Sequence, residues 1–292
     1  QISVIGSGMM GSGIAYASIL QGLEVLLIDQ NIKAAEAGKA KIEMLLSESV
    51  KRKKLSEEEK IRLLKKVKTD ASLENISSSD LVIEAVFEDL HLKHNLYKKI
   101  EPHLKEGAIL ASNTSTLPIT KLSEVLADST RFLGIHFFSP VDKMNLVELI
   151  KSERTNDNAL AAALDYTSLI KKTPIVVNDS RGFYANRCII PYINEGLRML
   201  NEGIEPALIE NSAKQIGMPV GPLQLLDELS VSLALNVAKE TKEALGTKYE
   251  ETGTESILLE MSQKNRLGRK ELAGFYEYDE KGRRSKLWEG LK

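Results

Sequence analysis

Cysteine is almost absent from the sequence, which carries only Cys188 among its 292 residues. A chain with one thiol can form no internal disulfide and no zinc site built on several thiolates, and we predict no metal site. The sequence also lacks the uninterrupted run of about 18 apolar residues that a membrane-spanning helix needs. Charge of one sign is not in excess either, because 39 lysines and arginines face 41 aspartates and glutamates. We therefore expect no membrane span and no nucleic acid as the main partner.

The apolar content, 42% of the residues, is that of an ordinary globular protein, and the length predicts two domains. Residues 1–178 alternate short β-branched runs with longer helical patterns, which is typical of an α/β protein whose mainly parallel sheet is covered on both faces. The runs expected to form strands are Ile2–Ile5, Glu24–Ile28, Leu81–Ala85, Ala108–Ala111, Phe132–Phe138, Leu146–Ile150 and Ile175–Val177.

Two regions show helical periodicity without a recognisable strand. Residues 31–68, approximately, predict a helical hairpin inserted into the sheet domain, and Ser56 with Glu59 forms a capping box for its second helix. We place the domain boundary at 179–182, and residues 179–292 predict an all-helical C-terminal domain. Its helices are expected at about residues 183–203, 205–216, 221–245 and 254–263.

A glycine-rich motif lies between the first expected strand and the first expected helix, and consists of Gly6, Ser7, Gly8, Met9, Met10 and Gly11. In a dinucleotide-binding fold Gly6 permits the tight turn, Gly8 lets the backbone approach a pyrophosphate, and Gly11 allows close packing of helix and strand. Asp29 ends the next strand, where a carboxylate accepts hydrogen bonds from a ribose diol and repels a 2′-phosphate. We therefore predict a doubly wound domain of the Rossmann type that binds NAD rather than NADP. The alternative is a glycine-rich turn without a ligand.

His136 differs from the other three histidines because it lies in an apolar run, where a half-buried imidazole needs a partner. This run and the next expected strand can form an antiparallel hairpin centred on Asp142, which places His136 directly opposite Glu148. A carboxylate on one ring nitrogen fixes the tautomer and makes the other nitrogen a better base. The pattern predicts a general-base dyad, and the alternative is a core histidine with a structural partner.

Two further polar segments are candidates for substrate contact. The segment 113–116 (NTST), which includes Ser115, follows an expected strand at the edge where open α/β sheets place ligands. A helix cap before Pro118 is an equally good interpretation. Asn186 lies in the first turn of the first C-terminal helix, where an exposed polar residue without a special role is the alternative.

Several motifs in a fixed order give the chain a family resemblance. They are Gly6–Gly11, Ser112–Ser115, His136–Pro140, Glu148, Gly182–Arg187, Gly221-Pro222 and Gly274–Tyr276. Over nearly its whole length the chain resembles the L-3-hydroxyacyl-CoA dehydrogenases of fatty-acid β-oxidation. It is most similar to the dehydrogenase part of the multifunctional β-oxidation α-subunit, through His136–Met144, Lys172–Tyr184 and Gly274–Trp288. The start at Gln1 then suggests a segment of a longer protein.

The resemblance implies an NAD-dependent, reversible oxidation of L-3-hydroxyacyl-CoA to 3-ketoacyl-CoA. His136 matches the catalytic base and Glu148 its orienting carboxylate. Ser115 and Asn186 match residues that contact the reacting oxygen of the substrate and the nicotinamide region. Further positions on the cofactor side are Glu88, Lys93, Ser115, Ser139 and Lys270.

The substrate that the resemblance implies ends in the 3′-phospho-ADP group of coenzyme A. The tip of the helical hairpin carries Lys51, Arg52, Lys53 and Lys54, and no other cluster of the first domain is as basic. Ammonium and guanidinium groups bind phosphate by charge-assisted hydrogen bonds. We therefore expect this tip to bind the acyl-CoA, and the alternative is a solvated charged loop.

Several choices stay open at the level of the sequence. The family resemblance implies either a homodimer through the helical domain or a part of a longer multifunctional chain. A bacterial cytoplasm, a mitochondrion and a peroxisome all fit, and neither the acyl chain length nor the physiological direction is set. A non-catalytic, crystallin-like structural member of the same fold and a CoA-independent 3-hydroxy acid dehydrogenase are the alternative functions.

Overall fold

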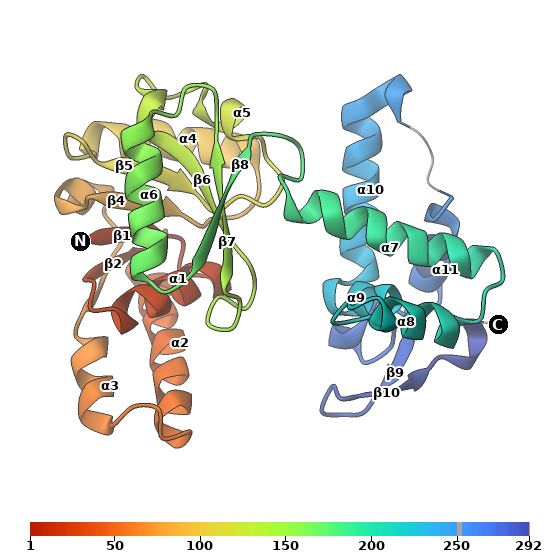
Figure 1. Cartoon of the computed structure of the whole chain (residues 1–292). Coiled ribbons are helices and arrows are strands. Elements are labelled where there is room, and N and C mark those ends of the chain that lie inside the picture. Colours follow the sequence, from red (N-terminus) through yellow and green to blue (C-terminus); the bar gives the residue numbers. More distant parts are fainter. Residues whose placement is uncertain (250–252, 292) are drawn as a thin grey trace. The chain divides into compact units, whose positions relative to one another are not determined.

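The computed structural model describes residues 1–249 and 253–291. They form two compact units, Gln1–Tyr184 and Ala185–Lys292 (Figure 1). The first unit contains one large sheet with helices on both of its faces, and the second is mainly helical. In the part of the chain that the structure describes, no helix is both long and apolar enough to span a membrane.

The division between the units falls after Tyr184, a few residues beyond the 179–182 segment expected from the sequence. Phe183 explains the difference, because its side chain is buried among the apolar residues of the first unit. Asp179 is tied to the first unit as well, since its carboxylate accepts hydrogen bonds from the backbone N–H groups of Ile119 (2.8 Å) and Thr120 (2.7 Å). The chain therefore leaves the first unit only after these two anchors.

The sheet of the first unit has eight strands in the order β3-β2-β1-β4-β5-β6-β7-β8. Strands β1 to β6 run parallel to one another, β7 pairs antiparallel with β6, and β8 runs parallel to β7. The first six strands thus have the 3-2-1-4-5-6 order of a doubly wound dinucleotide-binding fold, as predicted. The strands are β1 (Ile2–Ile5), β2 (Val25–Ile28), β3 (Val67–Asp70), β4 (Leu81–Glu84), β5 (Ile109–Ser112), β6 (Phe132–Phe137), β7 (Leu146–Lys151) and β8 (Thr173–Asn178).

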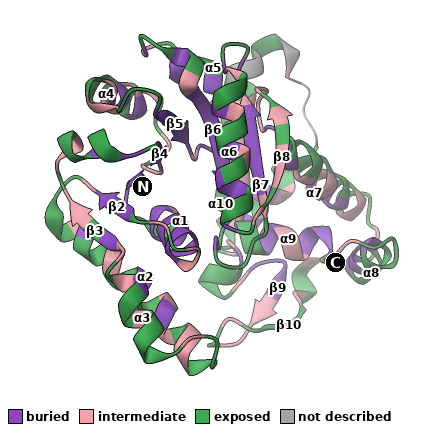
Figure 2. Ribbon diagram, turned by 60° about the vertical axis from the view of Figure 1, so that its left-hand side comes forward, coloured by how far each residue is buried: buried purple, intermediate pink, exposed green. Residues whose placement is uncertain are grey.

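Helices cover both faces of this sheet, so that its central strands are buried on both sides (Figure 2). Apolar side chains of α1, α2 and α6 pack against one face, and those of α4 and α5 pack against the other. Burial on two faces explains why these strands are continuous apolar runs rather than alternating ones. The helices are α1 (Met9–Leu20), α2 (Ile32–Lys51), α4 (Leu90–Ile100), α5 (Ile119–Ser123) and α6 (Asp157–Leu169).

The predicted helical hairpin is present and consists of α2 and α3 (Glu57–Leu64). Its capping box is confirmed, because the Ser56 hydroxyl accepts a hydrogen bond from the N–H of Glu59 and the Glu59 carboxylate accepts one from the N–H of Ser56. The prediction that residues 31–68 contain no strand was wrong at their end, where β3 begins and pairs with β2 at the edge of the sheet. Three of the four residues of β3 (VKTD) are polar, so no apolar run marks it.

The second unit is mainly helical, as predicted, but it also contains a β-hairpin that the sequence analysis missed. The helix expected over 221–245 is two helices, because Ser230 has a φ of 92°, ends the first of them and caps the second through its hydroxyl. The elements are α7 (Ala185–Asn201), α8 (Pro206–Gln215), α9 (Pro222–Leu229), α10 (Val231–Leu245), α11 (Glu255–Gln263) and the antiparallel strands β9 (Tyr276–Tyr278) and β10 (Arg284–Leu287).

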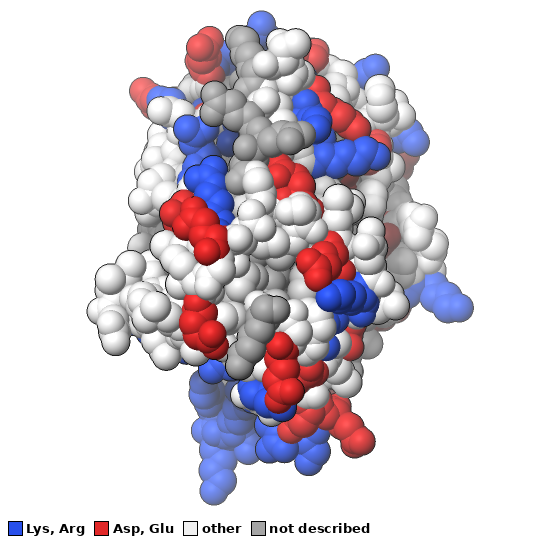
Figure 3. Space-filling view, turned by 90° about the vertical axis from the view of Figure 1, so that its right-hand side faces the viewer, with Lys and Arg blue, Asp and Glu red and all other residues white. Residues whose placement is uncertain are grey.

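Charged side chains of both signs are spread over the face of the molecule that Figure 3 shows. Lysines and arginines lie among aspartates and glutamates over most of that face, and basic side chains gather at its lower end. Exposed ion pairs, such as Arg269 with Glu228 at 2.9 Å, contribute only about 0–1 kcal/mol each. The apolar cores therefore supply most of the stability of each unit.

Two buried carboxylates, Glu210 and Asp227, connect distant parts of the second unit. Glu210 accepts hydrogen bonds from a backbone N–H at the start of α9 (2.8 Å) and from the Tyr276 hydroxyl (2.7 Å). Asp227 accepts them from the N–H groups of Phe275 (2.8 Å) and Tyr276 (2.9 Å), and a Cβ on Gly274 would overlap its carboxylate. Burial raises the pKa of Asp227 to about 6 despite these hydrogen bonds.

Gly38 lets α2 lie against the turn between β1 and α1, because a Cβ at this position would overlap the Cβ of Ser7. We expect Gly38→Ala to destabilise the first unit by about 1–3 kcal/mol, the usual cost of overpacking. Without that overlap, the same change inside a helix would stabilise it by roughly 0.5–1 kcal/mol. Urea unfolding shows whether the free energy of unfolding falls or rises in Gly38→Ala. Ala37→Gly, on the exposed side of α2, is the control that measures helix propensity alone. A stabilised Gly38→Ala variant would show that α2 does not pack against the turn.

Candidate functional site

The turn between β1 and α1 gives the three glycines of the motif different surroundings. Gly6 has a φ of +100°, and a Cβ there would lie 2.5 Å from the carbonyl oxygen of Ala85. A Cβ on Gly11 would overlap the carbonyl oxygen of Gly6. A Cβ on Gly8 would meet no atom within 4 Å. Gly8 is the N-cap of α1 and has no side chain to cap the helix. Packing thus requires Gly6 and Gly11, whereas Gly8 leaves open space beside the first N–H groups of α1, where a pyrophosphate fits.

Asp29 follows β2 directly, and its carboxylate binds the glycine-rich turn. Its Oδ2 accepts hydrogen bonds from the backbone N–H (2.7 Å) and the hydroxyl (2.6 Å) of Ser7, and its Oδ1 accepts one from the N–H of Gln30 (2.7 Å). Burial alone would raise the pKa of Asp29, but these hydrogen bonds and the charge of Lys41 keep it below its ordinary value. An ionised Oδ1 has lone-pair capacity beyond one hydrogen bond and can accept a ribose hydroxyl. These residues therefore fit NAD.

The predicted register of the β6–β7 hairpin is confirmed. His136 lies directly opposite Glu148, and Nδ1 of His136 is 2.7 Å from Oε2 of Glu148. Both side chains are buried, and the rings of Phe138 and Phe183 lie against the imidazole, with centroids 4.6 and 5.9 Å away. The other oxygen of Glu148 accepts a hydrogen bond from the N–H of Tyr184 at 2.9 Å. The carboxylate is thus held from two sides and fixes the orientation of the imidazole.

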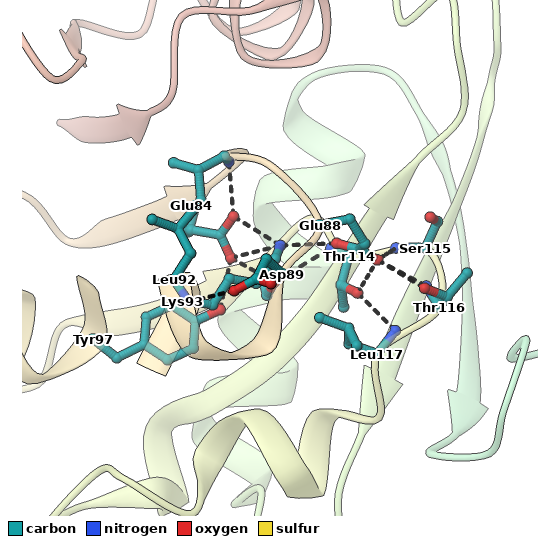
Figure 4. A network of polar contacts seen from close by, with 12 residues as sticks. Glu84, Glu88, Asp89, Leu92, Lys93, Tyr97, Thr114, Ser115, Thr116 and Leu117 are labelled. Carbon is teal, nitrogen blue, oxygen red and sulfur yellow. Dashed lines mark hydrogen bonds and ion pairs between the residues drawn. The ribbon is translucent and has the colours of Figure 1, made fainter. Parts of the chain in front are cut away.

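The segment that carries Ser115 is bound by Glu88, which precedes α4 (Figure 4). A single oxygen of Glu88, Oε1, accepts hydrogen bonds from the Thr114 hydroxyl (2.5 Å), the Ser115 N–H (2.9 Å), the Thr116 N–H (3.0 Å) and the Thr116 hydroxyl (3.2 Å). Burial raises the pKa of Glu88, but the ammonium group of Lys93 and the hydrogen bonds outweigh it and lower the pKa to about 2. Glu88 therefore holds this segment as an anion.

Asn113 ties the same segment to the strand of His136. Its side-chain oxygen accepts a hydrogen bond from the N–H of Phe137 at 2.9 Å, and β5 and β6 are neighbours in the sheet. The interpretation of 113–116 as the cap of the next helix was wrong, because Asp179 takes the first N–H groups of α5. The segment therefore sits at the carboxyl edge of the sheet, as expected of a ligand-binding loop.

Lys93 is almost fully buried, at 1% exposure, and its ammonium group lies between Glu84 (2.9 Å) and Glu88 (3.0 Å). Glu84 ends β4 and also accepts hydrogen bonds from the hydroxyls of Tyr97 (2.6 Å) and Ser112 (2.8 Å). Glu84, Tyr97 and Ser112 were not predicted from the sequence as parts of this network. The one signal for them was a charged residue at the end of an otherwise apolar strand (LVIE). Contact of Lys93 with the cofactor stays a prediction.

The remaining residues expected near the cofactor lie outside this network. Met9 is exposed at the start of α1, Met10 is half-buried, and the Ser139 hydroxyl is 3.9 Å from the sulfur of Met9. Asn186 is the second residue of α7, and Lys270 lies exposed in the short 3₁₀ helix Arg269–Glu271. Both belong to the second unit, and their roles stay predictions.

The basic tip of the α2–α3 hairpin is fully open to solvent. Lys51, Arg52, Lys53 and Lys54 are all exposed. Arg52 forms an exposed ion pair with Glu48 at 3.3 Å. The other three side chains form no ion pair with any residue that the structure describes. Lys51, Lys53 and Lys54 thus present cations that form no ion pair with a described carboxylate.

Comparison with known proteins agrees with this geometry. Residues 1–180 match the family model of the 3-hydroxyacyl-CoA dehydrogenase NAD-binding domain, and residues 182–278 match that of the C-terminal domain. The (S)-3-hydroxybutyryl-CoA dehydrogenase PaaH1 from Ralstonia eutropha is 36% identical, with a TM-score of 0.88, over 96% of this chain and 99% of that one. M. tuberculosis FadB2 is 32% identical, with a TM-score of 0.87, over 95% and 98% of the two chains.

A third relative is a longer protein. The 3-hydroxybutyryl-CoA dehydrogenase from Escherichia coli K12 is 30% identical, with a TM-score of 0.89, and the match covers 95% of this chain but 59% of that one.

The glycine-rich turn, Asp29 and the matched domain agree that NAD is the cofactor. With both of its domains matched in order, the chain belongs to the 3-hydroxyacyl-CoA dehydrogenase family.

Proposed function

We propose that this protein oxidises L-3-hydroxyacyl-CoA to 3-ketoacyl-CoA with NAD, reversibly, with His136 as general base and Glu148 as its orienting carboxylate. The observation that carries the proposal is the buried contact of 2.7 Å between Nδ1 of His136 and Oε2 of Glu148. Membership of the family supports the substrate class, as do the relatives described as 3-hydroxybutyryl-CoA dehydrogenases.

The dyad sets where the proton goes. Because Glu148 accepts the hydrogen bond at Nδ1, the lone pair of His136 lies on Nε2, which takes the hydroxyl proton of the substrate. The imidazole then becomes a cation beside the Glu148 carboxylate, whose charge stabilises it. NAD, held by the glycine-rich turn and Asp29, would supply the acceptor for the hydride that leaves the carbon bearing this hydroxyl. The hydrogen bond from the N–H of Tyr184 keeps Glu148 in place during this change of charge.

The other predicted residues complete this proposal. Ser115 and Asn186 contact the reacting oxygen, where hydrogen-bond donors stabilise developing negative charge. The basic tip Lys51–Lys54 binds the 3′-phospho-ADP group of coenzyme A. We assign the reaction to fatty-acid β-oxidation, carried out by a homodimer formed through the second unit or by a longer multifunctional chain. Relatives of both lengths are known, since PaaH1 and FadB2 match over 99% and 98% of their chains and the Escherichia coli relative over 59%.

Cofactor choice should depend on Asp29. We expect the wild-type enzyme to prefer NADH strongly over NADPH, and Asp29→Ala to lower kcat/KM for NADH by about 10- to 100-fold, since a hydrogen bond to a charged group contributes roughly 1.5–3 kcal/mol. The kcat/KM for NADPH should fall less, because Asp29→Ala also removes the repulsion between the carboxylate and the 2′-phosphate. Asp128→Ala, which removes an exposed carboxylate before β6, is the matched control. A wild-type enzyme that uses both cofactors equally well would contradict the assignment.

The reduction of acetoacetyl-CoA, followed by the loss of NADH absorbance, tests the dyad. We expect His136→Ala to lower kcat by about 10²- to 10⁴-fold, the usual contribution of general acid–base catalysis, with an unchanged circular dichroism spectrum. Glu148→Gln should also lower kcat, because the imidazolium loses its neighbouring charge. His91→Ala, at an exposed position on α4, should leave the rate unchanged. A folded wild-type protein without any turnover would instead favour the non-catalytic, crystallin-like alternative.

The same dyad predicts opposite pH profiles for the two directions. Oxidation needs a neutral His136, so its kcat/KM should rise with pH. Reduction needs the imidazolium, so its kcat/KM should fall over the same range. Profiles that are flat in both directions, with chemistry shown to limit the rate, would rule the dyad out.

Binding of coenzyme A by the hairpin tip should depend on salt. Exposed charges are screened as the Debye length falls from about 10 Å at 0.1 M to 3 Å at 1 M salt, so KM for acetoacetyl-CoA should rise with ionic strength. KM for the acetoacetyl group on a truncated pantetheine carrier should barely change. The double variant Arg52→Ala/Lys53→Ala should raise only the first KM. Lys98→Ala/Lys99→Ala, on exposed positions of α4, removes the same charge elsewhere and is the control. An equal response of both carriers would show a merely solvated loop.

A further inference from the structure

A buried ion-pair network lies at the carboxyl edge of β4 and β5, next to the segment that carries Ser115 (Figure 4). Its single cation, Lys93, lies between the carboxylates of Glu84 and Glu88. The side chains of Glu84 and Lys93 are 0% and 1% exposed, and that of Glu88 is 31% exposed. Two anions therefore share one ammonium group, and neither Glu84 nor Lys93 reaches solvent.

Glu84 is the inner end of this network and joins three elements of the first unit. Its Oε1 accepts hydrogen bonds from the N–H of Val86 (2.8 Å) and from the ammonium group of Lys93 (2.9 Å). Its Oε2 accepts them from the hydroxyls of Tyr97 on α4 (2.6 Å) and Ser112 on β5 (2.8 Å), and also from Lys93 (3.1 Å). With β4 and α4 both bound to one carboxylate, the position of the ammonium group is fixed.

The outer end of the network reaches the two peptide groups that flank Ser115. Lys93 holds Oε2 of Glu88 at 3.0 Å, which leaves Oε1 directed at the segment after β5. Oε1 accepts a hydrogen bond from the N–H of Ser115 (2.9 Å), which belongs to the peptide group before Ser115. It also accepts one from the N–H of Thr116 (3.0 Å), which belongs to the peptide group after Ser115. The contacts therefore run without interruption from Glu84 to the backbone of Ser115.

Stability alone does not account for these charges. Replacement of a buried ion pair by well-packed apolar residues is often neutral or stabilising, because the desolvation of the ions offsets their attraction. An apolar cluster could join β4 to α4 equally well, but it could not hold Glu88 or accept the N–H groups on either side of Ser115. The charges are thus required to hold Glu88 and the segment around Ser115, and not to join β4 to α4.

We propose that Glu84 is a positioning residue that fixes Ser115 through Lys93 and Glu88. The proposal rests on the proposed function, in which Ser115 contacts the reacting oxygen. The side chain of Glu84 is 0% exposed, so Glu84 acts through its neighbours and not as a catalytic residue. In Glu84→Gln the ammonium group loses one of its two anions and moves towards Glu88, so that the segment around Ser115 shifts. Because a misplacement of about 1 Å can lower a rate ~10²-fold, we expect kcat to fall by about 10- to 100-fold with little change in KM.

A double-mutant cycle tests this proposal, with kcat measured for the reduction of acetoacetyl-CoA by NADH. The proteins compared are the wild type, Glu84→Gln, Ser115→Ala and the double variant. If Glu84 acts through Ser115, the double variant is no slower than the slower single variant. If the two losses multiply, or if Ser115→Ala keeps the full kcat, the proposal is wrong. The proposed function is tested separately, by the turnover of the wild type and by the loss of turnover in His136→Ala.

Two further variants separate positioning from a general loss of stability. Tyr166→Phe removes a buried hydroxyl that lies 2.9 Å from that of Ser18, among the residues on the opposite face of the sheet, and any effect of it should multiply with that of Ser115→Ala. Tyr97→Phe removes one donor to Glu84 and keeps every charge, and it serves if Glu84→Gln does not fold. Its smaller loss of kcat should vanish in the Ser115→Ala background. A loss that persists there overturns the proposal.

Discussion

A carboxylate taken out of water must be met by donors or by a cation, since its burial is otherwise very costly. The first unit meets this requirement at each junction that shapes the site. Asp29 binds the glycine-rich turn, Glu88 binds the segment after β5, and Glu148 binds the imidazole of the β6–β7 hairpin. Asp179 does the same for the start of α5. Each carboxylate joins parts of the chain that are distant in sequence, so its hydrogen bonds form only when the site is assembled.

Glu88, which is half-buried, and Asp227, which is buried, respond differently to the loss of solvent because their partners differ. Glu88 has the ammonium group of Lys93 at 3.0 Å, and its pKa falls to about 2. Asp227 relies mainly on neutral donors with a weaker contribution from Arg266, so burial prevails and raises its pKa from 3.8 to about 6. A folded-state pKa above the unfolded one stabilises the protein below about pH 4, and this stabilisation is lost as the pH rises through about 6. Asp227 in the second unit therefore carries this dependence on pH, whereas Glu88 keeps its charge.

Strong local patterns made the centre of the fold and part of the site predictable. The glycine-rich turn and Asp29 lie within one strand–helix–strand unit, and the pairing of His136 with Glu148 follows from counting residues around a hairpin. The strands β3 and β10 were missed because three of their four residues are polar, and β9 was missed because it has only three residues. No apolar pattern therefore marks them, and their pairing comes from their neighbours. Ser230 was missed as a helix break because a φ of 92° is rare for a residue other than glycine. Glu84 was missed because its partners come from separate elements and meet only in the folded chain.

The second hydrogen bond of Glu148 has a mechanical consequence. Its donor, the N–H of Tyr184, belongs to the last residue of the first unit, and α7 begins at the very next residue. A shift of this backbone N–H moves the carboxylate with it as long as the hydrogen bond holds, and the 2.7 Å contact on the other oxygen passes the shift to the imidazole of His136. The last residue of the first unit and this imidazole are thus coupled through a single side chain.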